Sequence, residues 1–184
     1  MRVIAGEAKG RKLKAPAHGV RPLTDRAKET LFNILNPNIE DANFLDLFAG
    51  SGSVGIEALS RGAKLSFFVE KSRDVVKFIY ANLGSTGLRD RAEVFLLDVR
   101  RAIKILDSKG AKFDIIYVGA PYGSKDFVPS LELLGNSSLL HSKAIVVAEH
   151  RSRDAIPENI NKLSKYREKK LGDTTLSFYK VEST

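Results

Sequence analysis

The sequence predicts an α/β protein built on a doubly wound, mostly parallel sheet. Short apolar runs alternate with helix-like segments through the middle of the chain, which is the pattern of parallel strands joined by crossover helices. A glycine-rich loop follows the first run, and acidic residues stand at the ends of three successive runs. Because ligands bind outside the carboxyl ends of parallel strands, these residues predict a binding cleft at that edge of the sheet.

Five apolar runs are expected to be buried parallel strands: residues 44–48, 65–70, 94–98, 113–118 and 144–148. Helix-like segments lie at residues 53–61, 73–83, 99–108 and 127–134, and Gly62, Gly87 and Gly110 follow three of them as expected helix ends. Residues 166–171 and 174–181, joined by Gly172 and Asp173, predict an antiparallel hairpin. The expected sheet is therefore Rossmann-like, with seven strands and an antiparallel C-terminal strand.

The N-terminal segment breaks this alternation and carries most of the positive charge. Residues 2–5 and 11–15 predict a small β-hairpin, and residues 24–35 predict a helix. The net charge is +8, and the first 28 residues hold eight basic side chains against two acidic ones. Such a cluster favours a polyanionic partner, nucleic acid before membrane, although a solvated arm without a partner has the same composition.

Composition limits the other possibilities. A chain of 184 residues with 43% hydrophobic content suits one substantial core, perhaps with a small appendage. There is no cysteine, the three histidines form no ligand pattern, and no segment approaches the roughly 20 apolar residues of a membrane span. We expect a cytoplasmic protein, monomeric, with neither a metal site nor a membrane anchor.

The stretch LDLFAGSGSVGIEAL, residues 45–59, is the most informative motif. Gly50, Gly52 and Gly55 stand between the first strand and a helix, where missing side chains let the backbone turn tightly beside a ligand. The spacing is G-x-G-x-x-G, and Glu70 follows Gly50 by 20 residues, as in dinucleotide-binding proteins. A nicotinamide cofactor is therefore one alternative.

Three observations favour S-adenosylmethionine instead. Asp46 precedes the loop, where a carboxylate would repel a pyrophosphate but attract an ammonium group. Asp98 ends the third strand and could accept a hydrogen bond from an adenine amine, while Glu70 holds ribose hydroxyls. The chain also has no room for a separate dehydrogenase substrate domain. Taken singly, each acid has a structural alternative: Asp46 could cap a loop, Glu70 could be a surface strand end, and Asp98 could cap the next helix.

At these residues the sequence resembles the class I methyltransferases, and more closely the RsmD family of 16S rRNA guanine-N2 methyltransferases. The resemblance covers nearly the whole chain through RVIAGEAKGRKLKAP, RPLTDRAKETLFNIL, DLFAGSGSVGIEALSRGA and GDTTLSFY. It implies a methyltransferase domain at residues 41–184, an RNA-contacting extension at residues 1–40, and 16S rRNA or the small ribosomal subunit as partner. The expected cofactor-binding residues are Asp46, Phe48, Gly50, Ser51, Gly52, Gly55, Glu70, Lys71, Asp98 and Val99.

The segment Gly119-Ala120-Pro121-Tyr122 stands where the family has Asp or Asn, then Pro-Pro, then Tyr or Phe. The resemblance implies that this loop grips the exocyclic amine of the target base, through an acidic or amide side chain, a backbone carbonyl and a stacking ring. Gly119 has no side-chain acceptor, so only the carbonyls and Tyr122 remain. A turn without any chemistry is the alternative. We expect Gly119→Asp to raise activity if the loop is a weakened active site.

The resemblance also implies a set of RNA-binding residues. Those matching the family or the basic hairpin are Lys9, Arg11, Lys12, Arg21, Thr24, Asp25 and Arg26. A capped surface helix with Asp25 in its first turn is the structural alternative. Two other functions remain open: a DNA or RNA adenine-N6 methyltransferase, whose loop has similar chemistry, and a non-catalytic RNA-binding protein that retains the cofactor fold.

Overall fold

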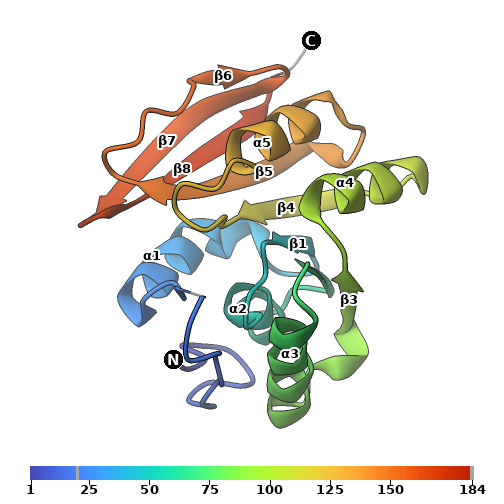
Figure 1. Cartoon of the computed structure of the whole chain (residues 1–184), viewed down its shortest axis with the longest axis vertical. Helices are drawn as coiled ribbons and strands as arrows, with labels where there is room; N and C mark the ends of the chain where they lie inside the picture. The colour runs from blue at the N-terminus through green and yellow to red at the C-terminus, as the bar shows by residue number, and fades with distance from the viewer. Residues whose placement is uncertain (20, 183–184) are drawn as a thin grey trace.

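The computed structural model describes residues 1–19 and 21–182, and within them eight strands form one sheet (Figure 1). The strands are β1 (Asn43–Leu47), β2 (Leu65–Glu70), β3 (Ala92–Leu96), β4 (Phe113–Val118), β5 (Leu140–Arg151), β6 (Asn159–Ile160), β7 (Leu163–Leu171) and β8 (Thr174–Val181). The order across the sheet is β3-β2-β1-β4-β5-β8-β7-β6. Pairings from β3 to β5 are parallel, and those of β5 with β8, β8 with β7 and β7 with β6 are antiparallel. The predicted doubly wound, mostly parallel fold is confirmed.

Helices cover both faces of this sheet. They are α1 (Asp25–Leu35), α2 (Ser53–Ser60), α3 (Arg73–Thr86), α4 (Val99–Ser108) and α5 (Phe127–Asn136), with short 3-10 turns at Asn36–Asn38 and Arg89–Arg91. Apolar residues of α1, α2 and α3 share one buried cluster, and those of α4 and α5 share another. In Figure 1 the last two helices lie together on one side of the sheet. Successive side chains of the central strands β1 and β4 therefore pack alternately into one cluster and the other.

Three helices begin at side-chain caps that the sequence supplies. Thr24, Ser72 and Asp98 each accept a hydrogen bond from the backbone N–H three residues later, at 3.1, 3.4 and 3.0 Å. Such caps satisfy N–H groups that have no partner inside the helix. Gly87 ends α3 in the left-handed conformation, with φ +73°, as predicted.

The structure differs from the predicted elements in several places, among them β5 and β7, which begin four and three residues earlier than predicted. The two-residue β6 adds an eighth strand that was too short to give a pattern. The third strand begins and ends two residues earlier than predicted, so Asp98 lies beyond it as the cap of α4. The predicted N-terminal hairpin forms only as a short pairing, with an antiparallel bridge between Arg2 and Lys12 and 2.9 Å backbone hydrogen bonds that join Val3 to Gly10 and Arg11. Beyond this pairing, the N–H groups of Ile4 and Ala5 donate to the carboxylate of Glu57 on α2.

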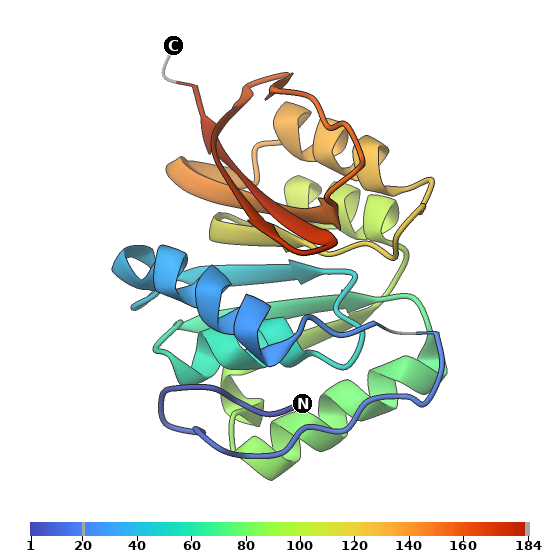
Figure 2. The same ribbon diagram turned by 90° about the vertical axis from the view of Figure 1, so that its left-hand side faces the viewer.

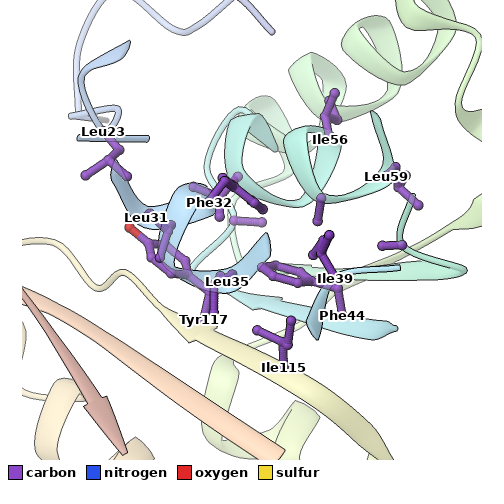
Figure 3. Close-up of a cluster of buried hydrophobic side chains, with 14 of the residues drawn as sticks. Leu23, Leu31, Phe32, Leu35, Ile39, Phe44, Ile56, Leu59, Ile115 and Tyr117 are labelled. Atoms are coloured by element: carbon purple, nitrogen blue, oxygen red, sulfur yellow. The ribbon is translucent and has the colours of Figure 1, made fainter. Parts of the chain in front are cut away.

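The N-terminal segment packs into the main core. Val3, Ala8, Leu13 and Leu23 are buried in the same cluster as the residues of α1 and β1. Figure 3 shows how Leu31 and Leu35 of α1 lie against β1 and β4 in this cluster. Figure 2 shows the segment passing alongside α3 before it reaches α1, and there the backbone of Lys14 exchanges two 2.8 Å hydrogen bonds with the side chain of Asn82.

None of the helices in the described part of the chain is long and apolar enough to cross a membrane.

Candidate active site

A cavity of about 770 Å³ opens at the carboxyl ends of the parallel strands. This volume is within the range of small-molecule and cofactor sites, about 300 to 1,000 Å³. The cavity lies at the point where the strand order reverses between β1 and β4, where the fold class binds its ligands. The predicted residues that line it are Arg21, Asp46, Phe48, Gly50, Ser51, Glu70, Lys71, Asp98, Val99, Gly119, Ala120, Pro121 and Tyr122. The structure therefore brings together most of the residues that the sequence singled out.

The loop after β1 has a backbone that two carboxylates hold in place. Gly50 has φ +57°, and its N–H donates to Oε2 of Glu70 at 3.1 Å. The N–H of Gly55 donates to Oδ2 of Asp46 at 2.9 Å. Phe48 also has a positive φ, +62°, which is a costly conformation for a residue with a side chain. A strained backbone conformation of this kind persists where surrounding contacts fix it, and here the hydrogen bonds to Glu70 and Asp46 fix the loop.

Gly52 and Gly55 do not line the cavity, although we predicted that they bind the cofactor. A Cβ at Gly55 would lie 2.7 Å from Oγ of Ser66 and would also meet the ring of Phe68. A Cβ at Gly52 would lie 3.3 Å from both Ile79 and Phe68. Both glycines therefore allow α2 to approach the sheet and α3 closely. They support the loop by packing.

Asp46 is a buried carboxylate at the floor of the cavity, with only 1% of the residue exposed. Burial, together with the nearby charges of Glu70 and Glu149, raises its pKa to about 7, although the hydrogen bond from Gly55 acts in the opposite direction. No basic side chain forms an ion pair with it among the described residues. This part of the cavity therefore suits a cationic group, which would compensate the carboxylates.

Glu70 and Asp98 have structural roles as well as places on the cavity wall. The second carboxylate oxygen of Glu70 accepts from the N–H of Ser72 at 2.9 Å, so the side chain braces both the glycine loop and the cap of α3. Asp98 caps α4, as the structural alternative proposed, and still lines the cavity. A carboxylate has about four lone-pair sites, so these bonds leave acceptors for a ligand.

The Gly119–Tyr122 segment forms the opposite wall of the cavity, beyond the end of β4. The hydroxyl of Tyr122 lies 2.6 Å from Oγ1 of Thr174, which ties the loop to β8. The guanidinium groups of Arg21 and Arg151 lie 5.1 and 5.2 Å from the centre of the Tyr122 ring. This wall of the cavity therefore contains the aromatic ring of Tyr122 and, beside it, the planar guanidinium groups of Arg21 and Arg151.

The remaining predicted RNA-binding residues lie outside the cavity. Thr24 caps α1, and Asp25 forms an ion pair with Arg2 at 3.2 Å, so both have the contacts of the structural alternative. The side chains of four predicted cations are exposed: Lys9, Arg11, Lys12 and Arg26. Exposure leaves these cations available to a polyanion.

Tyr117, Glu149 and Arg151 are among the residues of the cavity wall that the sequence analysis did not name. Tyr117 stands inside an apolar run and gave no signal. Glu149 directly follows the predicted strand at residues 144–148, so it is a fourth acid at a strand end. The rule that selected Asp46, Glu70 and Asp98 would have selected it as well.

Known proteins are similar to this chain in fold and in sequence. The family described as "Conserved hypothetical protein 95" matches residues 1–180. The chain is 36% identical to the "Putative rRNA methyltransferase YlbH" of Bacillus subtilis, over 98% of each chain. It is 35% identical to the "Ribosomal RNA small subunit methyltransferase D" of Escherichia coli, over 100% of this chain and 91% of that one. A solved structure, "Putative methyltransferase yhhF from Escherichia coli", superposes with a TM-score of 0.86 at 35% identity and covers 100% of this chain and 99% of that one.

The doubly wound sheet, the glycine loop and the cleft at the strand ends define a Rossmann-like methyltransferase of class I. Within this class, the chain belongs to the conserved hypothetical protein 95 family, which is the RsmD family.

Proposed function

We propose that this protein transfers a methyl group from S-adenosylmethionine to the exocyclic N2 amine of a guanine in 16S ribosomal RNA, in the cytoplasm. The observation that carries the proposal is the cavity in which Asp46, Glu70 and the Gly119–Tyr122 segment meet. The printed names of the relatives, which are rRNA methyltransferases, support the RNA substrate. The exposed cations of the N-terminal segment supply sequence-independent contacts to phosphates.

The cofactor supplies an activated methyl group on a sulfonium. We infer that Asp46 compensates its ammonium group, that Glu70 accepts hydrogen bonds from its ribose, and that Asp98 and Val99 border its adenine. These assignments follow from the carboxylates on the cavity wall and from the raised pKa of Asp46, which a bound cation would lower again.

The base enters from the side of the Gly119–Tyr122 segment. The target base must be unstacked, either because it lies in an RNA loop or because it is flipped out of a helix, since a stacked base cannot reach the cavity. Tyr122 and the guanidinium groups of Arg21 and Arg151 offer flat surfaces on which a base can stack. Orientation of the amine in line with the methyl group then supplies much of the rate.

The test is transfer of a tritiated methyl group from S-adenosylmethionine to unmodified small ribosomal subunits, followed by nucleoside analysis of the digested RNA. Label in N2-methylguanosine is the expected result. Label in N6-methyladenosine would replace the proposal by the adenine-N6 alternative. Cofactor binding by calorimetry, without transfer of label to any nucleoside, would replace it by the non-catalytic RNA-binding alternative, which Gly119 favours.

A further inference from the structure

Two side chains from neighbouring strands occupy the space beside Gly119. A Cβ built on Gly119 would lie 2.6 Å from Cε1 of Tyr117 and 3.3 Å from Oε2 of Glu149. The hydroxyl of Tyr117 donates a hydrogen bond to the same carboxylate oxygen of Glu149. The place that an acidic side chain at position 119 would take is therefore already filled, and one of the groups that fills it is a carboxylate.

Strand register brings these residues together. Val118 of β4 pairs with Ala148 of β5, so Gly119 and Glu149 follow the last matched pair of two adjacent parallel strands. Glu149 lines the main cavity and also a smaller one of about 230 Å³ beneath the Tyr122 loop. Its carboxylate is partly buried and faces the cavity that contains Gly119 and Ala120.

We propose that Glu149 is a catalytic residue that accepts a hydrogen bond from the exocyclic amine of the target base, in place of the side chain that Gly119 lacks, and that Tyr117 is the residue that positions it. This inference rests on the proposed function, since it concerns the same amine and the same cavity. A buried Tyr117 ring fixes the hydroxyl, and the hydroxyl uses only part of the acceptor capacity of the carboxylate.

The chemistry balances with this carboxylate as acceptor. The lone pair of the amine nitrogen forms the new N–C bond, and the electrons of the C–S bond leave with the sulfur, which becomes a neutral thioether. The nitrogen gains positive charge as it reacts, and its proton passes to Glu149 and then to solvent. Burial raises the pKa of Glu149, which makes it a better proton acceptor than an exposed glutamate.

The first test compares Glu149→Ala with the wild type in methyl transfer to unmodified small ribosomal subunits. We expect kcat to fall about 10²-fold or more, as when one preorganised polar group is removed from an active site. Cofactor affinity in calorimetry at pH 8 should stay within about threefold of the wild type, because at that pH Asp46 is charged with or without Glu149 beside it. Glu93→Ala is the matched control, since Glu93 is an exposed strand glutamate outside the cavity. If Glu149→Ala unfolds, the nearly isosteric Glu149→Gln takes its place, with a smaller expected fall in kcat, because its amide oxygen still accepts a hydrogen bond but cannot take up the proton.

The outcomes separate the two proposals. Transfer by the wild type that survives unchanged in a folded Glu149 variant overturns the role of Glu149 alone. Absence of transfer by the wild type overturns the proposed function and this assignment with it.

Tyr117→Phe tests the positioning role, because it removes the hydroxyl and keeps the ring. The groups that face Glu149 are Tyr117, Tyr122, Arg21 and Asp46. The hydrogen bond from Tyr117 lowers the pKa of Glu149, so its loss should move the acidic limb of the kcat profile to higher pH. A limb at the wild-type pH would overturn the role of Tyr117.

Discussion

Lys28 of α1 and Glu57 of α2 form an ion pair in which neither side chain is exposed, with Nζ 3.6 Å from Oε2. The ammonium group also donates to the carbonyl of Arg2 at 2.6 Å and to Oγ of Ser53 at 2.9 Å. Glu57 in turn accepts from the N–H groups of Ile4 and Ala5. This buried cluster joins the N-terminal segment to two helices.

Lys28→Met should destabilise the protein by about 1 to 3 kcal/mol, because the buried carboxylate of Glu57 keeps Arg61 at 2.8 Å but loses its partner on α1. The measurement is urea unfolding followed by circular dichroism. Lys77→Met is the control, since Lys77 and Asp74 form an ion pair with side chains 71% and 88% exposed, and it should change the midpoint little. Equal midpoints for Lys28→Met and the wild type would contradict the structural role of the buried pair.

Cofactor affinity should depend on pH through Asp46. Its pKa of about 7 means that the carboxylate gains a proton as the pH falls below neutrality. A bound ammonium group requires the charged form, so affinity for S-adenosylmethionine should be greatest near pH 8 and fall by up to about tenfold per pH unit below the pKa. Glu70 and Glu149 are the acids that face Asp46, and both oppose its ionisation.

Calorimetric titrations of the wild type and Asp46→Asn at pH 6, 7 and 8 test this dependence. The variant should bind more weakly at pH 8 and lose most of the dependence, because its amide does not titrate. A wild-type affinity that is the same at pH 6 and pH 8 would remove Asp46 from the cofactor site.

Gly55→Ala should destabilise the protein by about 1 to 3 kcal/mol, because the added methyl group meets Ser66 and Phe68 of β2. Gly84→Ala is a matched change, since Gly84 is an exposed helical residue of α3 with no atom near its Cβ position. That change should stabilise the protein by about 0.5 to 1 kcal/mol. Thermal unfolding measures both, and a shift in the same direction for the two variants would refute the close packing of α2 on the sheet.

Gly119→Asp should lower activity, contrary to the expectation from the sequence alone. The new Cβ would lie 2.6 Å from the buried ring of Tyr117 and would displace the ring or the loop. Opening the space with Tyr117→Ala should let the aspartate fit. We therefore expect Gly119→Asp in a Tyr117→Ala, Glu149→Ala background to have a higher kcat than that background alone, in the tritium assay. A single Gly119→Asp variant more active than the wild type would refute this interpretation.

The exposed cations of the N-terminal segment should set the salt dependence of RNA binding. Replacing Arg11 and Lys12 by glutamine should weaken binding to small-subunit rRNA and lower the slope of log affinity against log salt by about 1 for each phosphate that is no longer neutralised. Lys104 and Lys109, exposed on and after α4, provide the control pair. Fluorescence anisotropy across a salt series measures both. Equal slopes for the two double variants would place the RNA elsewhere.

The sequence alone predicted the fold class, because hydrophobic alternation and glycine punctuation are local properties of a chain. It also predicted the cleft, since acids at the ends of parallel strands must meet at one edge of the sheet. The same reasoning correctly placed Asp46, Glu70 and the Gly119–Tyr122 segment on a common cavity. It missed β6, which has only two residues, and it did not predict the hydrogen bonds of Ile4 and Ala5 with Glu57.

Only the tertiary structure decided what stands beside Gly119. Tyr117 and Glu149 are 32 positions apart, and their hydrogen bond depends on the register in which β4 pairs with β5. A slip of one residue in this pairing would leave the two side chains on opposite faces of the sheet, and no periodic pattern specifies that register. The missing acid at position 119 was therefore visible in the sequence, whereas the carboxylate that stands in its place became visible only when the two strands were paired.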